Sequence, residues 1–275
     1  MDFVIVDENI ITKDEMNITP FIREDTFQLS CKIWFGFGGI PFFDENRITI
    51  LEQLKQLNLP VPAIMKNERE LFRITKRMMN KNKFYRSGFI HLQLFCNDKQ
   101  VHTVITGTPS REVMFPFRKK GMLLTYSSQR KYSNNAFNRF SFSNHTLWQV
   151  SKREIADTQF GNSIILNEKN GICETIHSNI FILTKNELLT PSLNCGCYQD
   201  VFRNIIKQLA SELDFNVKEP DKIEPADLLM ADEIFIAGEA YGMDWILGIE
   251  NKRFVHHYSA VIHEKLNDLL QQKVH

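Results

Sequence analysis

The chain has 275 residues, of which 43% are apolar and 24% charged, the composition of an ordinary globular protein with room for one large domain or two small ones. Lys plus Arg and Asp plus Glu both number 33, so the formal net charge is zero and gives no electrostatic case for binding nucleic acid or an anionic membrane surface. No apolar run approaches the ~20 residues of a membrane-spanning helix, and residues 1–8 lack the basic and apolar parts of a signal peptide, so we expect a cytoplasmic protein.

The first part of the chain alternates short strands with two helices. A hairpin is expected over residues 3–11, and strands are expected over 88–95 and 101–105. The first helix is predicted to begin after an N-cap at Asp44, and the second to cover residues 67–80. The inner face of the first helix is predicted to carry Ile48, Leu51, Leu54 and Leu57. The glycine-rich run at 36–39 lacks both the dinucleotide fingerprint and the Lys-Ser/Thr ending of a phosphate loop, so it is interpreted as a turn.

Residues 116–121 read as a linker to a second part with its own strands and helices. A strand is expected over 122–127 and a helix over about 144–160. Another helix is expected over 201–213, with Asp200 as its N-cap. An amphipathic helix with Tyr258, Ile262, Leu266 and Leu269 on one face closes the chain.

The cysteines do not form a metal-binding pattern. The five are Cys31, Cys96, Cys173, Cys195 and Cys197. Only the last two are close in sequence, and the second ligand pair of a zinc site is missing. We therefore expect no metal site and mostly buried free thiols.

Residues 161–183 combine three short apolar strands with one conspicuous acid. Glu174 lies between Ile172 and Ile176. A carboxylate between two buried strands is costly unless it has a partner, whereas the simpler interpretation is an exposed loop glutamate.

The same stretch resembles the class IV family of pyridoxal-phosphate (PLP) enzymes, which includes branched-chain and D-amino-acid aminotransferases and 4-amino-4-deoxychorismate lyase. The resemblance is carried by Gly171, Glu174 and the run Asn179-Ile180-Phe181, and further along by Thr190-Pro191 and Ala231-Asp232-Glu233. It implies the two-domain α/β (α+β) fold of the D-amino-acid aminotransferase-like enzymes. It also implies a small α/β domain over 1–118, a larger domain over 119–275 with a cleft between them, and a homodimer.

The resemblance places the family's cofactor contacts on named positions of this chain. These are Thr49, Glu174, Asn179, Asp200, Val201, Phe202, Arg203, Gly238 and Glu239. In the family the glutamate pairs with the pyridine nitrogen, while the N–H groups near the glycine of the arginine motif and a Thr or Ser further on hold the phosphate. The Schiff-base lysine position corresponds to Ser141.

Four of these positions depart from the family pattern. Ser141 replaces the lysine, Thr49 an arginine that clamps the phosphate, Asp200 a glycine, and Glu239 the Thr or Ser. A serine cannot form the imine on which PLP chemistry depends. An acid near 4 Å from a phosphate would also cost about 4 kcal/mol at an effective dielectric constant of about 20.

We therefore predict a protein with the class IV fold that does not bind PLP. It is either a pseudoenzyme or a protein that uses the family's cofactor cleft for another purpose, and a small-molecule ligand is compatible with both. The rival hypothesis is an active PLP-dependent aminotransferase or aminodeoxychorismate lyase in which Lys131 or Lys152 replaces the missing lysine. A third hypothesis is catalysis without PLP, with Glu174, Glu239, Asp200 or His145 as acid–base groups. The simpler alternative to this third hypothesis is that the carboxylates are ordinary surface groups. No nucleic acid, membrane or metal partner is expected.

Overall fold

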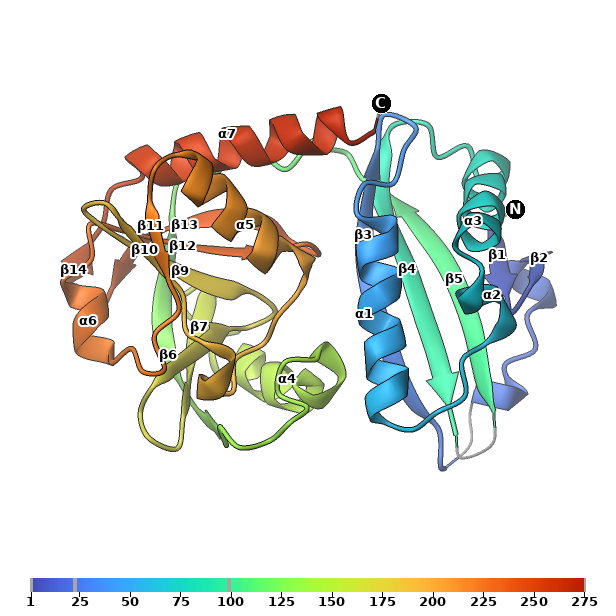
Figure 1. The fold of residues 1–275 in the computed structure, drawn as a ribbon, viewed down its shortest axis with the longest axis horizontal. Helices are drawn as coiled ribbons and strands as arrows, with labels where there is room; N and C mark the ends of the chain where they lie inside the picture. The colour runs from blue at the N-terminus through green and yellow to red at the C-terminus, as the bar shows by residue number, and fades with distance from the viewer. Residues whose placement is uncertain (1, 22–23, 98–99, 275) are drawn as a thin grey trace. The chain divides into compact units, whose positions relative to one another are not determined.

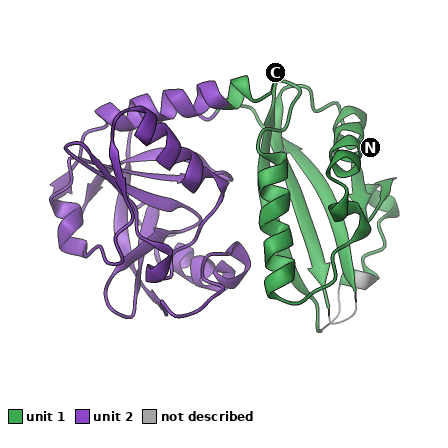
Figure 2. Cartoon of the chain, viewed as in Figure 1, with its two compact units in different colours: residues 1–114, 270–275 green, residues 115–269 purple. Residues whose placement is uncertain are grey.

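The structure, a computed structural model, describes residues 2–21, 24–97 and 100–274. The chain splits into two compact units, one of Met1–Met114 with Leu270–His275 and one of Phe115–Leu269 (Figure 2). The division lies close to the boundary expected after residue 118 and also assigns the C-terminal residues to the first unit. Both units mix helices and sheets, so the predicted α/β fold class is confirmed.

Unit 1 is organised on a five-stranded sheet in the order β2-β1-β5-β4-β3 (Figure 1). Its strands are β1 (Phe3–Val6), β2 (Asn9–Thr12), β3 (Phe27–Gly36), β4 (Ser87–Cys96) and β5 (Val101–Pro109). All neighbouring strands run antiparallel. The glycine-rich run after Phe35 is a turn, as expected, since Gly36 and Gly39 exchange backbone hydrogen bonds.

Three helices accompany this sheet: α1 (Phe43–Gln56), α2 (Ala63–Lys66) and α3 (Glu68–Lys81). Helix α1 packs on β3 and α3 packs on β1. Asn67 caps α3 through its side chain, whereas the N-cap predicted at Asp44 is wrong. Helix α1 begins at Phe43 instead, after Phe42 in a left-handed conformation.

The predicted inner face of α1 is also partly wrong. Ile48 is 44% exposed, and the buried positions of α1 are Phe43, Asn46, Ile50, Gln53 and Leu54. The buried stripe is turned relative to the predicted one because a polar amide, Asn46, packs inward and donates to the Phe42 carbonyl oxygen. Apolar periodicity alone does not reveal such an inward polar residue.

Unit 2 is organised on a larger mixed sheet. Among the described residues its strand order is β11-β10-β9-β12-β13-β6-β7-β8, with β14 paired to β13. The strands are β6 (Met122–Lys131), β7 (Asn162–Asn167), β8 (Ile172–Thr175), β9 (Asn179–Thr184), β10 (Glu187–Leu189), β11 (Asn216–Lys218), β12 (Glu233–Gly238), β13 (Gly242–Ile249) and β14 (Lys252–Arg253). Strand β6 runs parallel to β7 and to β13, and a bulge shifts the β6–β7 register between Tyr126 and Arg130.

The helices of unit 2 are α4 (His145–Glu154), α5 (Val201–Glu212), α6 (Pro225–Leu229) and α7 (His257–Gln272), the last of which ends among the residues assigned to unit 1. Helix α4 packs on β6 and β7, and α5 packs on β12 and β11 (Figure 1). Helix α4 ends earlier than the predicted residue 160. Its final carboxylate, Glu154, accepts hydrogen bonds from Ser127 and Ser128 of β6, which anchor the end of α4 to the sheet. No helix in the described part of the chain is long and apolar enough to cross a membrane.

Candidate functional site

Glu174, the acid on which the sequence resemblance centres, is completely buried on β8. Three donors converge on its carboxylate. The Lys131 Nζ lies 2.7 Å from Oε2, and the Trp148 Nε1–H donates to Oε1 at 2.8 Å. The backbone N–H of Tyr198 donates to Oε2 as well. The carboxylate therefore has the partner that its burial demands, and the interpretation as an exposed loop glutamate is wrong.

Lys131 stands at the end of β6 with a side chain that is 1% exposed. Its position in the sheet comes from the parallel pairing of Lys131 with Asn167, after the β6 bulge. Lys131, one of the two lysines considered as a replacement, therefore reaches Glu174. No local sequence pattern marks this pair, because the two residues are 43 positions apart and only the strand arrangement brings them together.

Ser141, which the sequence resemblance aligns with the family's lysine, lies on a short 3-10 helix, η3 (Ser141–Ser143). Asn144 follows this turn, and its side-chain amide donates to the carbonyl oxygens of Asn138 and Phe140. Lys152, the other lysine considered as a replacement, is exposed on α4. Of Lys131 and Lys152, only Lys131 therefore contacts Glu174.

Aromatic rings pack around the Glu174 carboxylate. The Trp148 ring lies 4.5 Å from the His177 ring and 5.0 Å from the Tyr198 ring, between centroids. His145, a predicted acid–base candidate, lies 6.0 Å from Trp148, and burial lowers the pKa of its imidazole below the ordinary value. These rings surround Trp148, one of the three donors to the Glu174 carboxylate.

A second polar cluster gathers at the N-terminus of α5, around Asp200. Asp200 caps this helix, as the sequence predicted: its Oδ1 accepts from the Arg203 N–H at 3.2 Å and from the Asn179 side-chain amide at 2.9 Å. Its Oδ2 accepts from the Glu239 N–H at 2.9 Å. Burial raises the pKa of this partly exposed acid to about 6, although the surrounding donors oppose the shift.

Gly238 allows the backbone to approach this cluster closely. A Cβ atom there would lie 2.8 Å from the His177 carbonyl oxygen and 3.2 Å from the Asp200 Oδ2. A larger residue would therefore push β12 away from Asp200 and remove the Glu239 N–H from its acceptor.

The Arg203 side chain binds other parts of the same unit. It is 1% exposed, and its guanidinium donates to the Thr190 hydroxyl, the Pro191 carbonyl oxygen and the Glu219 carboxylate, at 2.9, 2.5 and 2.8 Å. Arg203 therefore ties α5 to the turn after β10. Its backbone N–H, and not its side chain, contacts Asp200.

The remaining predicted contacts are dispersed. Phe202 is fully buried, with its ring 5.6 Å from the ring of Phe115, and Val201 is partly buried beside it. Thr49 belongs to unit 1, where its hydroxyl donates to the Glu45 carbonyl oxygen within α1. The structure therefore brings five of the predicted contacts together around the α5 N-terminus: Asn179, Asp200, Gly238, Glu239 and the backbone of Arg203. Glu174 lies in a second cluster with Lys131.

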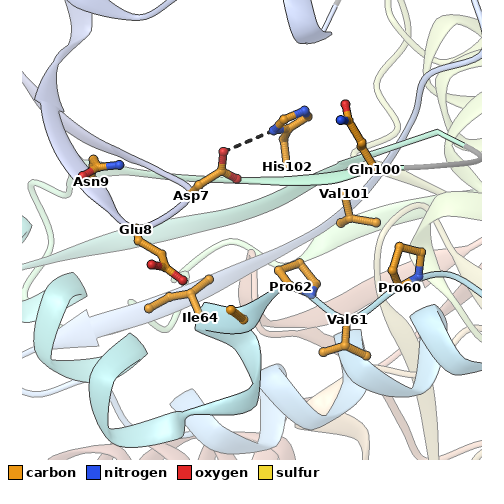
Figure 3. A pocket seen from close by; sticks show the side chains of 11 residues that line it. Asp7, Glu8, Asn9, Pro60, Val61, Pro62, Ile64, Gln100, Val101 and His102 are labelled. Carbon is orange, nitrogen blue, oxygen red and sulfur yellow. Dashed lines mark hydrogen bonds and ion pairs between the residues drawn. The ribbon is translucent and has the colours of Figure 1, made fainter.

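A separate open pocket of about 420 Å³ lies wholly within unit 1 (Figure 3). Asp7 and His102 face each other across its rim, with the Asp7 Oδ2 3.2 Å from the His102 Nδ1. None of the predicted site residues lines it. Among the described residues there is no group of three His, Cys, Asp or Glu side chains that could hold a metal ion.

Comparisons with known proteins connect this chain to one family. The sequence model of the family described as amino-transferase class IV matches residues 51–243. A probable branched-chain-amino-acid aminotransferase of Aquifex aeolicus is 25% identical over 270 residues, which cover 92% of this chain and 86% of that protein. An aminodeoxychorismate lyase of Vibrio harveyi is 30% identical over 113 residues, which cover 40% of this chain and 41% of that protein.

Solved structures share the fold over nearly the whole chain. The branched-chain aminotransferase of Thermoproteus uzoniensis with norvaline has a TM-score of 0.87 at 18% identity, covering 99% of this chain and 95% of that chain. The branched-chain amino acid aminotransferase of Escherichia coli has a TM-score of 0.85 at 17% identity, covering 100% and 96%. The fold expected from the sequence resemblance is confirmed.

Proposed function

This chain belongs to the amino-transferase class IV family, and we propose that it is a pseudoenzyme of that family, one that forms no aldimine with PLP. The observation that carries the proposal is the occupied carboxylate of Glu174. Lys131, Trp148 and the Tyr198 N–H already donate to its two oxygens. A pyridine nitrogen would need the same oxygens, so the residues around Glu174 do not fit the cofactor ring.

The nature of residue 141 also supports this proposal. An aldimine needs an amine, and a serine hydroxyl cannot supply one. The resemblance aligns Ser141 with the lysine position, and Ser141 lies on the η3 turn just before α4. A cofactor bound without this covalent link would lose the group that moves the proton during transamination.

The rival candidate is an active aminotransferase or lyase in which Lys131 forms the aldimine. It is favoured by one observation: the Lys131 Nζ lies 2.7 Å from the acid that pairs with the ring in this family. Against it, this amine already lies in a fully buried ion pair with Glu174. To form an imine, Lys131 would have to lose its proton and leave Glu174 without a counter-charge, which is costly in a buried site.

Absorption spectroscopy with borohydride reduction separates the two candidates. Purified protein is titrated with PLP, the aldimine absorption band is followed, and the mixture is reduced and digested to find modified lysines by mass spectrometry. We expect no saturable band and no label on Lys131, with only scattered reaction of exposed lysines such as Lys152. A stoichiometric label on Lys131, absent in a Lys131→Arg variant, would establish the rival candidate.

A homodimer and a cytoplasmic location are further parts of the proposal, and both come from the sequence resemblance and composition. Light scattering of the purified protein would measure the oligomeric state directly. A small-molecule ligand fits the proposal, although the sequence identifies no particular compound. The acid–base hypothesis without PLP stays a prediction.

A further inference from the structure

We propose that two side chains of this protein replace the two charged ends of the family's cofactor: the Lys131 ammonium stands for the ring nitrogen at Glu174, and the Asp200 carboxylate stands for the phosphate at the α5 N-terminus. The inference rests on the proposed function in one respect, that no PLP binds. It goes further because it states which side chains take the place of the cofactor in the clusters around Glu174 and Asp200.

The Glu174 end carries a positive donor of the right charge. A protonated pyridine nitrogen offers a carboxylate one cationic N–H, and Lys131 offers the same interaction from within the chain at 2.7 Å. Trp148 and the Tyr198 N–H complete the set of donors without adding charge. The ion pair is thus neutral overall, and its carboxylate accepts from three donors, which is the condition for tolerating a buried charge.

The Asp200 end carries a negative acceptor of the right charge. Backbone N–H groups at a helix N-terminus form an anion site, because they point outward and the helix dipole favours negative charge. Here the N–H groups of Arg203, in α5, and of Glu239, in the turn after β12, both donate to the Asp200 carboxylate. The Asn179 amide adds a third donor from β9. Asp200 is therefore an internal anion for donors that come from three different elements.

The chain consequently needs no ligand to satisfy either cluster. Restoring a lysine at residue 141 alone would not restore cofactor binding, because both ends would still be filled. Removing Asp200, in contrast, should leave two backbone donors facing a position that is already partly open to solvent.

The Asp200 end is tested with inorganic phosphate as the probe. Thermal melting of the wild type and of Asp200→Gly and Asp200→Ser variants is measured at about pH 7.5 with increasing phosphate. We expect both variants to gain phosphate-dependent melting temperatures, rising by about 5–10 °C when phosphate reaches about 100 times its Kd. The serine hydroxyl can still cap α5 through the Arg203 N–H, but it is too short to replace the carboxylate for the Glu239 N–H and the Asn179 amide. The second variant therefore keeps the test valid if glycine disturbs folding.

Two controls accompany this measurement. The first is Asp200→Asn, which keeps an acceptor of the same length at the same place and should gain no phosphate response. The second is sodium chloride at matched ionic strength, which should not raise the melting temperature of the Asp200→Gly and Asp200→Ser variants. A folded Asp200→Ser protein without phosphate binding would overturn the proposal. So would a wild type that responds to phosphate as strongly as the variants.

The Glu174 end is tested by stability and its rescue. Lys131→Met leaves a buried carboxylate without its cation, and we expect the melting temperature to fall by about 6–20 °C. The double variant Lys131→Met/Glu174→Gln should recover at least half of this loss, because the unpaired charge is gone. A Lys131→Met protein as stable as the wild type would overturn the replacement at this end.

These tests are independent of the PLP titration. A PLP aldimine in the wild type would defeat the proposed function, whereas the phosphate experiment uses no PLP and judges the Asp200 end by itself.

Discussion

Glu174 and Asp200 are two acids of the same unit whose charges are stabilised differently. Glu174 is completely buried and meets a cation, Lys131, at 2.7 Å. Asp200 is only partly buried and meets neutral donors: two backbone N–H groups and the Asn179 amide. Glu174 is the more deeply buried of the two, and a fully buried charge needs a counter-charge, whereas Asp200 is held by the dipoles of its neutral donors.

The largest loss of stability should come from removing the acid of the Lys131–Glu174 ion pair. Glu174→Gln leaves the Lys131 ammonium buried without its anion, so we expect the free energy of unfolding to fall by about 3–5 kcal/mol. Urea denaturation measures it. The control is Glu233→Gln, since Glu233 is also buried but accepts only from Tyr258 and Ser259. Its loss should be smaller because no buried cation is left behind, and equal losses would contradict the ion-pair interpretation.

A single donor to Glu174 can be removed with the loss of ring volume matched in the control. Trp148→Phe deletes the Nε1–H that donates to Oε1 at 2.8 Å, and hydrogen bonds to charged groups contribute about 1.5–3 kcal/mol. We expect a loss of that size in urea denaturation. The matched control is Trp245→Phe, which removes a hydrogen bond to the neutral Arg118 carbonyl oxygen and should cost about 1 kcal/mol. A smaller loss for Trp148→Phe than for Trp245→Phe would argue against a charged Glu174.

The pH dependence of stability should report on Asp200. Burial raises the pKa of Asp200 from 3.8 to about 6, so between these values the folded state binds the proton more tightly than the unfolded state. The contribution of Asp200 to the free energy of unfolding therefore falls as the pH rises from about 4 to about 6. After allowance for partial exposure, we expect about 1–2 kcal/mol between about pH 4.5 and about pH 7.

Comparison with Asp200→Asn isolates this contribution, because asparagine does not titrate. The difference in unfolding free energy between the two proteins should favour the wild type more at the lower pH. A difference that is constant over this window would mean that the pKa of Asp200 is not raised.

The smallest effect is expected at Thr49, the predicted phosphate contact in unit 1. Its hydroxyl only donates to the Glu45 carbonyl oxygen of the same helix. Thr49→Ala should therefore change the free energy of unfolding by less than about 0.5 kcal/mol, and it should leave the phosphate response of Asp200→Ser unchanged. Loss of that response would mean that Thr49 contributes to the anion site after all.

Local sequence patterns were sufficient for part of the site. Asp200 was predicted as the cap of α5 because an N-cap acid and its N3 amide are three residues apart, a relation that the sequence displays directly. The turn at Gly171 and the strands around Glu174 also follow from local residue types. The face of α1 did not, since the inward Asn46 breaks the apolar pattern that marked Ile48.

The sequence by itself determined the family and many of the helices and strands, because each of these is written in short runs of neighbouring residues. Only the tertiary structure decided that Lys131 is the partner of Glu174. That pairing depends on β6 lying parallel to β7 and on the bulge between Tyr126 and Arg130 that sets the register at Lys131. The physical reason is that the stability of a buried charge depends on what lies within a few ångströms, and separation along the chain does not report that distance.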